Sequence, residues 1–147
     1  MHVALVEPEI PPNTGNIART CVLTGTVLHL VGNLGFSLAD RYLRRAGLDY
    51  WPFLVFYTYK DFGSLWRYYR GCNFYFFTTK ASRLYTEVAF KKDDFLVFGK
   101  ETTGLPPELP AKWPDRCLRI PMVTGIPRSL NLANSVAVVL YEALRQQ

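Results

Sequence analysis

Residues 95–106 have the sequence FLVFGKETTGLP, in which a short apolar run leads directly into an unusual loop. The run Phe95–Phe98 has no polar position, which predicts a central strand covered on both faces, as in a parallel sheet. Gly99 and Gly104 bracket the polar loop that follows, and glycine lets the backbone approach a ligand closely. Ligands of open α/β sheets bind outside the carboxyl ends of the strands. The stretch therefore predicts both a fold class and a binding site.

The rest of the chain repeats this alternation of apolar runs and helical patterns, which predicts an α/β fold with a mostly parallel sheet flanked by helices. The expected strands are residues 3–6, 27–31, 53–57, 74–78, 95–98 and 118–121. The expected helices are residues 38–46, 61–69, 130–145 and a first one that Asn13 or Thr14 caps and that runs to about Thr24. We expect residues 1–147 to form one domain.

Composition narrows the class of protein. Hydrophobic residues make up 49% of the chain and charged residues 20%, which excludes a disordered protein. We find no pattern of a signal peptide and no apolar run that could cross a bilayer. The three cysteines (Cys21, Cys72 and Cys117) lie far apart, so we expect reduced thiols, no metal site and a cytoplasmic location. The net charge of +5 fits a polyanionic partner, or simply a basic solvated surface.

Two further loops follow predicted strands. The first, EPEIPPNTGNIAR (residues 7–19), places Asn16 and Arg19 at a helix start, which suits a phosphate; the alternative is a capped helix whose arginine pairs with a surface carboxylate. The third loop ends in RSLNLANS (residues 128–135), which supplies more polar side chains than one helix cap requires. The second loop, residues 99–107, matches neither a Walker A sequence nor G-x-G-x-x-G, which disfavours a nicotinamide cofactor, and Glu101 could simply be a capping carboxylate there.

Taken together, these stretches resemble the SPOUT class of methyltransferases, and within it the small single-domain enzymes that methylate the ribose 2′-oxygen of the tRNA wobble nucleotide. The matching stretches are EPEIPPNTGNIART (residues 7–20), LRRAGLDYW (43–51), FGKETTGLP (98–106), IPM (120–122) and RSLNLANSVAVVLYEALRQQ (128–147). The resemblance implies a carboxyl-terminal deep trefoil knot, a homodimer, and S-adenosyl-L-methionine as methyl donor, with S-adenosyl-L-homocysteine as product. It also implies that the substrate is a cytidine or modified uridine at position 34.

The resemblance assigns site residues as well. The implied cofactor-binding residues are Phe77, Thr78, Gly99, Gly104, Ile120, Ser129 and Leu130. The implied catalytic residues are Arg19, Asn16, Glu101, Ser129 and Asn131. A guanidinium keeps its proton at neutral pH, so we expect Arg19 to anchor phosphate and ribose and to stabilise a developing alkoxide, with the proton passing to water or phosphate. Glu101 is the alternative proton acceptor, or it orients Arg19 or the second loop. His2 and His29 fall in predicted strands, which favours a structural role.

RNA binding has to come from this same domain. Arg41, Arg44 and Arg45 form a basic cluster on one predicted helix, and Lys91 and Lys92 form another cluster. Stacking and phosphate contacts recognise an unpaired anticodon loop, so we expect the anticodon stem-loop of tRNA to bind near the arginines. Two other functions stay open: methylation of another tRNA or rRNA site, and a non-catalytic RNA-binding protein with the same fold.

Overall fold

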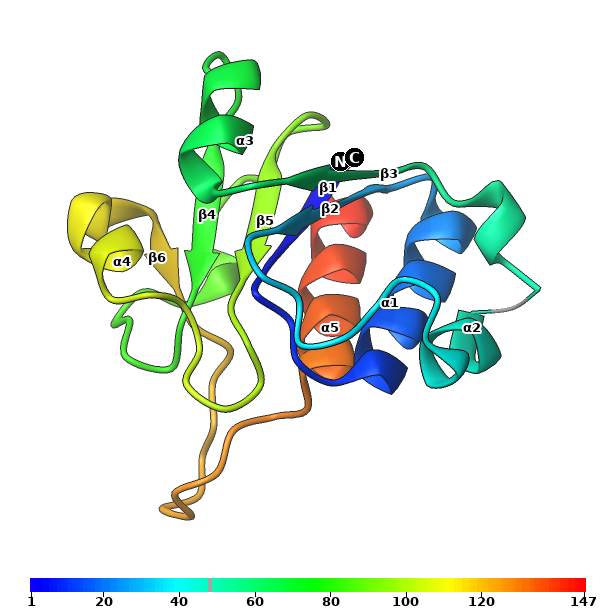
Figure 1. Ribbon diagram of the computed structural model, residues 1–147. Coiled ribbons are helices and arrows are strands. Elements are labelled where there is room, and N and C mark those ends of the chain that lie inside the picture. Colours follow the sequence, from blue (N-terminus) through cyan, green and yellow to red (C-terminus); the bar gives the residue numbers. More distant parts are fainter. Residues whose placement is uncertain (48) are drawn as a thin grey trace.

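A computed structural model describes residues 1–47 and 49–147. Within these residues, parallel strands form one six-stranded sheet in the order β3-β2-β1-β5-β4-β6 (Figure 1). The strands are β1 (His2–Val6), β2 (Val27–Val31), β3 (Phe56–Tyr59), β4 (Phe74–Phe77), β5 (Phe95–Phe98) and β6 (Cys117–Leu118). The predicted α/β class with a parallel sheet is therefore confirmed. Cys21, Cys72 and Cys117 are free cysteines.

Helices cover both faces of the sheet (Figure 1). The helices are α1 (Pro11–Thr24), α2 (Arg41–Gly47), α3 (Phe62–Tyr68), α4 (Glu108–Lys112) and α5 (Leu132–Arg145). Buried apolar side chains of α1 and α5 pack on one face, and those of α3 and α4 pack on the other. None of the helices in the described residues is long and apolar enough to span a membrane.

The first helix differs from the prediction in a way that matters for the site. It begins at Pro11, and the prediction that Asn13 or Thr14 caps it was wrong: Ile10 is the N-cap residue and provides no side-chain cap. Proline has no N–H group, so Pro11 and Pro12 leave two fewer donors to be satisfied at the helix start. Asn13 lies inside the first turn, and its side chain is free to bond elsewhere.

Helices α3 and α5 begin one and two residues later than predicted, and two other elements begin three residues later. Helix α2 starts at Arg41 because the carboxylate of Asp40 accepts hydrogen bonds from the backbone N–H groups of Tyr42 (2.8 Å) and Leu43 (3.4 Å). Strand β3 starts at Phe56 because Trp51–Phe53 form a 3₁₀ turn that contains Pro52. Leu48, which belongs to the predicted segment 43–51, lies outside the described residues.

Both histidines lie in strands, as predicted, and they contact each other. Nδ1 of His2 and Nε2 of His29 share a hydrogen bond of 3.0 Å among the rings of Tyr69 and Phe95. His29 is fully buried, and within the described residues its Nδ1 has no hydrogen-bond partner. Burial, with the neighbouring His2, lowers the pKa of His29 to about 3. Burial and the terminal ammonium group lower the pKa of His2 to about 4.

This pair predicts a loss of stability in mild acid. Below the ordinary histidine pKa of about 6.5, the unfolded chain binds protons that the folded chain excludes, so the free energy of unfolding falls with pH. For His29 alone we expect a fall of about 2 kcal/mol between pH 7 and pH 5. Urea unfolding at each pH measures it, with His29→Phe as the comparison. A His29→Phe protein whose stability has the same pH slope as the wild type would contradict this account.

Candidate functional site

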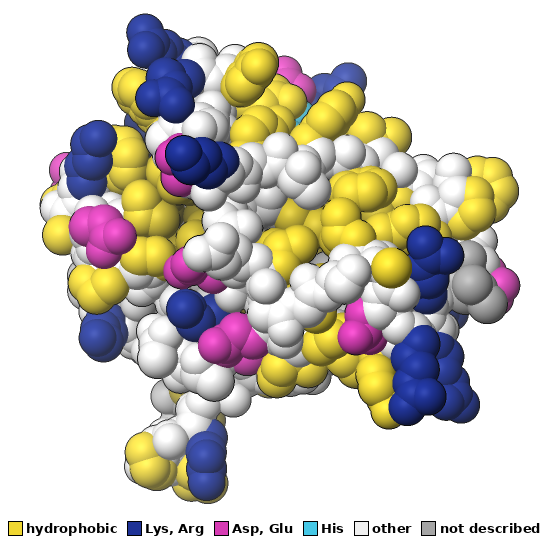
Figure 2. Space-filling model, viewed as in Figure 1, with side chains coloured by type: hydrophobic (Ala, Val, Ile, Leu, Met, Phe, Trp, Pro, Cys, Tyr) yellow, Lys and Arg dark blue, Asp and Glu magenta, His cyan; other side chains and the backbone are white. Residues whose placement is uncertain are grey.

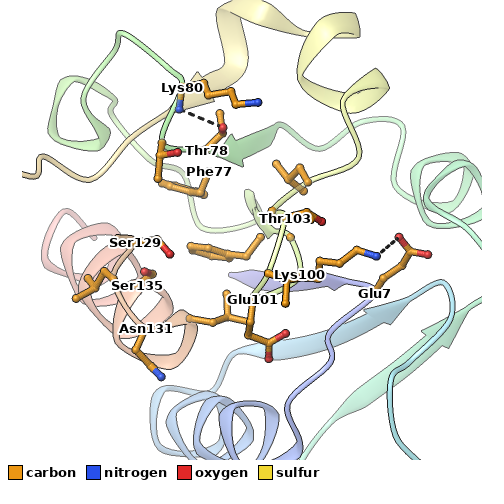
Figure 3. Close-up of a pocket in the computed structure, with 18 of the residues that line it drawn as sticks. Glu7, Phe77, Thr78, Lys80, Lys100, Glu101, Thr103, Ser129, Asn131 and Ser135 are labelled. Carbon is orange, nitrogen blue, oxygen red and sulfur yellow. Dashed lines mark hydrogen bonds and ion pairs between the residues drawn. The ribbon is translucent and has the colours of Figure 1, made fainter. Parts of the chain in front are cut away.

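A cavity of about 920 Å³ lies at the carboxyl ends of the central strands (Figure 3). Its walls come from the ends of β1, β4 and β5, from the loop before α4, and from the chain between β6 and α5. Residues from all three loops that the sequence analysis selected line it. The volume falls within the range of small-molecule sites, about 300–1,000 Å³.

The cavity has an apolar floor and a polar rim. Phe77 and Phe98 stack beneath it with their ring centroids 4.6 Å apart. All seven predicted cofactor-binding residues line this one cavity: Phe77, Thr78, Gly99, Gly104, Ile120, Ser129 and Leu130. The structure therefore brings together residues that are up to 53 positions apart in the sequence.

The loop after β5 closes tightly on itself. The N–H of Gly104 donates to the carbonyl of Lys100 (2.9 Å), and Gly104 has a left-handed backbone with φ of 74°. A Cβ atom at Gly99 would lie 2.0 Å from the carbonyl carbon of Gly104 and 2.1 Å from the nitrogen of Leu105. Only glycine fits this contact, so both glycines are required to shape this wall of the cavity.

The carboxylate of Glu101 joins the second loop to the first. It accepts hydrogen bonds from the backbone N–H of Glu9 (2.8 Å) and of Ile10 (3.0 Å), and from the side-chain amide of Asn13 (3.3 Å). In return, the carboxylate of Glu9 accepts from the hydroxyl of Thr102 (2.8 Å) and from its N–H (3.3 Å). The two loops therefore hold each other through a pair of ionised side chains.

Asn13 extends this network to the third loop. Its side-chain oxygen accepts a hydrogen bond of 3.0 Å from the amide of Asn131, while the side-chain oxygen of Asn131 caps α5 by accepting from the N–H of Asn134 (3.2 Å). We call Glu101, Asn13 and Asn131 the Glu101 network. The site prediction omitted Asn13. The Pro-Pro pair before it was the available signal, because it removes the need for a side-chain cap.

Two lysines that the site prediction also omitted line the cavity. Lys100 pairs with the carboxylate of Glu7 at 3.6 Å, and Lys80 follows Thr78 at the end of β4 (Figure 3). Glu7 is the one non-glycine residue with positive φ in the described residues, at 53°. Such a backbone costs about 1–2 kcal/mol and is concentrated at functional sites. The cavity therefore has cations next to its apolar floor.

The predicted catalytic residues divide into two groups. Glu101, Ser129 and Asn131 line the cavity, whereas Asn16 and Arg19 are exposed on α1 and do not. Arg19 lies six residues beyond Asn13, or about 9 Å further along the helix axis. Its guanidinium carbon is 4.9 Å from the ring centre of Tyr50. The expected contact of Arg19 with the site is thus absent within the described residues of one chain.

The two predicted basic clusters lie in different parts of the molecule, and neither lines the cavity. Arg41, Arg44 and Arg45 are exposed on α2, which packs closely against α1. Lys91 and Lys92 precede β5, so they lie near the amino ends of the strands, whereas the cavity lies at the carboxyl ends. In residues 1–47 and 49–147, no group of three or more His, Cys, Asp or Glu side chains is arranged to hold a metal ion.

The Glu101 network predicts a large effect of Glu101→Ala on stability. The change leaves two backbone donors without their ionised acceptor, which we expect to lower the free energy of unfolding by about 2–3 kcal/mol. Urea unfolding measures it. Glu108→Ala, on the exposed side of α4, is the matched control, and we expect a change within about 0.5 kcal/mol. Equal effects of the two substitutions would show that Glu101 does not hold the loops.

Comparisons with known proteins agree with this geometry. The model of the SpoU rRNA methylase family matches residues 1–141. A Geobacillus stearothermophilus protein, provisionally named a tRNA (cytidine(34)-2′-O)-methyltransferase, is 52% identical over all of this chain and 95% of its own length.

Two solved structures are also similar. One, from work on the 2-OH methylation of C/U34 on tRNA, superimposes with a TM-score of 0.94 at 42% identity and covers 99% of this chain and 94% of that one. The other, an AdoMet-bound rRNA methyltransferase from Sinorhizobium meliloti, has a TM-score of 0.80 at 27% identity and covers 98% of this chain and 55% of that one. From the extent of the family match and the identity to these relatives, we conclude that the chain belongs to the SpoU rRNA methylase family.

Proposed function

We propose that the chain is an RNA 2′-O-methyltransferase that uses S-adenosyl-L-methionine to methylate the ribose of nucleotide 34 of tRNA. The observation that carries the proposal is the single cavity that collects all seven expected cofactor residues, in a chain whose relatives are named for this reaction. We further propose that residues 1–147 act as one domain in the cytoplasm. The similarity in fold to SpoU structures also supports a carboxyl-terminal trefoil knot.

The cavity fits the proposed cofactor chemically. Its apolar floor of Phe77 and Phe98 suits an adenine ring, and the glycine-shaped wall at Gly99 exposes backbone groups that can recognise it. Lys80 and Lys100 suit a carboxylate or a phosphate at the rim. When bound, the cofactor supplies an electrophilic sulfonium methyl group.

The side chains of this protein would position the reactants. The Glu101 network fixes the three loops relative to one another, and alignment of reacting groups provides much of the rate enhancement in such a transfer. Glu101 already accepts three hydrogen bonds, so we assign it to positioning and not to proton removal. Ser129 and Asn131 would orient the cofactor and ribose at the rim.

Arg19 would act in a homodimer, at the cavity of the other subunit. Its own cavity does not contain it, and the surfaces of α1 and α5 beside it expose apolar side chains, with Leu23 62% exposed and Tyr141 56% exposed. Burial of these side chains against a second copy would stabilise the dimer. There Arg19 would hold the phosphate and ribose and stabilise the developing alkoxide, while the hydroxyl proton passes to water or phosphate.

Methyl transfer tests the function directly. Purified protein, labelled S-adenosyl-L-methionine and tRNA lacking the modification should yield label on the 2′-oxygen of nucleotide 34, located by digestion and mass spectrometry. Label at the 2′-oxygen of another ribose would contradict the proposed target nucleotide, but it would still support 2′-O-methyl transfer to RNA. Cofactor binding without any label on RNA would favour a non-catalytic RNA-binding protein.

Mixed dimers test the position of Arg19. Arg19→Ala and Gly99→Ala should each reduce transfer at least about 100-fold, the first by removing the anion-stabilising group and the second by displacing the cavity wall at Gly104 and Leu105. If Arg19 serves the other subunit, co-expression of the two should restore about a quarter of the wild-type activity, since half of the dimers are mixed and each has one complete site. No restoration in mixed dimers, with their assembly verified by mass spectrometry, would place Arg19 in its own subunit's site.

A further inference from the structure

A group of aromatic and cationic side chains lies outside the cavity, next to α3 and α4. Trp66 and Trp113 are both partly exposed, with their ring centroids 6.4 Å apart. The Nζ atom of Lys112 lies 4.7 Å from the ring centre of Trp113 and 5.8 Å from that of Trp66. The guanidinium carbon of Arg70 lies 5.4 Å from the ring centre of Trp66. We call these four residues the indole patch.

The cations of the indole patch are not neutralised by carboxylates. Within the described residues the ion pairs are Lys100–Glu7 and Arg145–Glu142, so neither Arg70 nor Lys112 has a carboxylate within 4 Å. Their charges rest on the faces of indole rings, an attraction of about 0.5–1 kcal/mol at exposed sites. The N–H groups of both side chains thus stay available to an anion.

The indoles form a firm platform. Trp113 stacks on the buried ring of Phe76, with centroids 5.2 Å apart and planes 8° apart, and meets Phe62 edge-on. Because its inner face is fixed by the core, Trp113 can present its outer side to a ligand without losing much conformational freedom. Figure 2 shows that hydrophobic side chains and the side chains of Lys and Arg lie next to one another over α3 and α4.

Helix α4 connects the cavity to the Lys112 and Trp113 end of the indole patch. Pro110 lines the cavity, and Lys112 and Trp113 follow within three residues of it along α4. The predicted RNA-binding arginines of α2 lie on the other side of the cavity-forming loops (Figure 1). A polynucleotide with one nucleotide in the cavity would therefore pass over α2 in one direction and over the indole patch in the other.

From this placement we propose that the indole patch binds the unpaired RNA that flanks the target nucleotide. A base would take the place of the Arg70 guanidinium on the face of Trp66, and the displaced Arg70, together with Lys112, would contact the phosphates. Aromatic rings next to cations are what single-stranded nucleic acid requires, since every base has a stacking face and every linkage has a charge. The inference rests on the proposed function, because it takes the nucleotide in the cavity to belong to RNA.

Paired charge reversals test the proposal. The double variant Arg70→Glu/Lys112→Glu and the control Lys91→Glu/Lys92→Glu change the net charge equally, and within the described residues neither control lysine lies over an indole ring. The measured quantity is the Kd of the intact protein for an unmodified anticodon stem-loop, by fluorescence anisotropy without cofactor. We expect the patch variant to raise the Kd at least about tenfold and to reduce the salt slope by about two, and the control to change the Kd less than about threefold.

A neutral substitution separates stacking from charge. Trp66→Leu should raise the Kd about five- to tenfold and leave the salt slope unchanged, because it removes a stacking face and no charge. Each variant should bind S-adenosyl-L-homocysteine like the wild type, which shows that the cavity is intact. If the double variant does not fold, Lys112→Gln replaces it, with an expected Kd increase of about threefold and a slope lower by about one.

Two outcomes would overturn the proposal. The first is a patch variant that binds the stem-loop as the control does. The second is a patch variant that loses RNA affinity only because its dimer dissociates in sedimentation, which would make the indole patch an interface between copies. Failure of the proposed function is distinguishable: a wild type that binds the stem-loop through the patch but methylates no tRNA refutes the function and supports the patch.

Discussion

The whole cavity depends on the ionised carboxylate of Glu101, which bonds two backbone N–H groups of the first loop and, through Asn13 and Asn131, fixes the third. Hydrogen bonds to a charged group contribute up to about 1.5–3 kcal/mol each, and less where water can replace the partner, as it can at the exposed N–H of Ile10. One side chain thus sets the relative positions of three segments that are distant in sequence. The same bonding occupies the carboxylate, and this is why a positioning role suits it better than proton transfer.

Local sequence chemistry makes this network possible. Pro11 and Pro12 start α1 without a side-chain cap, so the amide of Asn13 can bond to Glu101 and Asn131. Gly99 and Gly104 let the loop after β5 fold back to contact distances that no side chain would permit. With these features in place, Glu101 lies where the first loop can reach it. The shape of each loop therefore depends on its own prolines and glycines, and the hydrogen bonds of Glu101 and Asn13 then join the loops to one another.

Sequence patterns predicted the centre of the sheet well and its margins less well. Strands β2 and β5 begin and end at the predicted residues, since an apolar run defines each and only His29 interrupts the one in β2. Strand β3 and helix α2 start later because of a 3₁₀ turn at Pro52 and a cap at Asp40. The cofactor residues came from a family resemblance, and no periodicity would have collected them. The proximity of Trp66 to Trp113 had no local signal at all, because they lie 47 positions apart and meet only through the packing of α3 and α4.

The strand order explains why a small domain can present cations on both sides of one cavity. In the order β3-β2-β1-β5-β4-β6, the chain builds outward from β1 in one direction and around β5 in the other. The cavity lies at this reversal, where ligands of open α/β sheets bind. Helix α2 therefore brings its arginines to one side, and the carboxyl ends of α3 and α4 bring Arg70 and Lys112 to the other (Figures 1 and 2). These residues contain no separate RNA-binding domain. Cations on both sides of the cavity would let the one domain bind the phosphates on either side of a single reacting nucleotide.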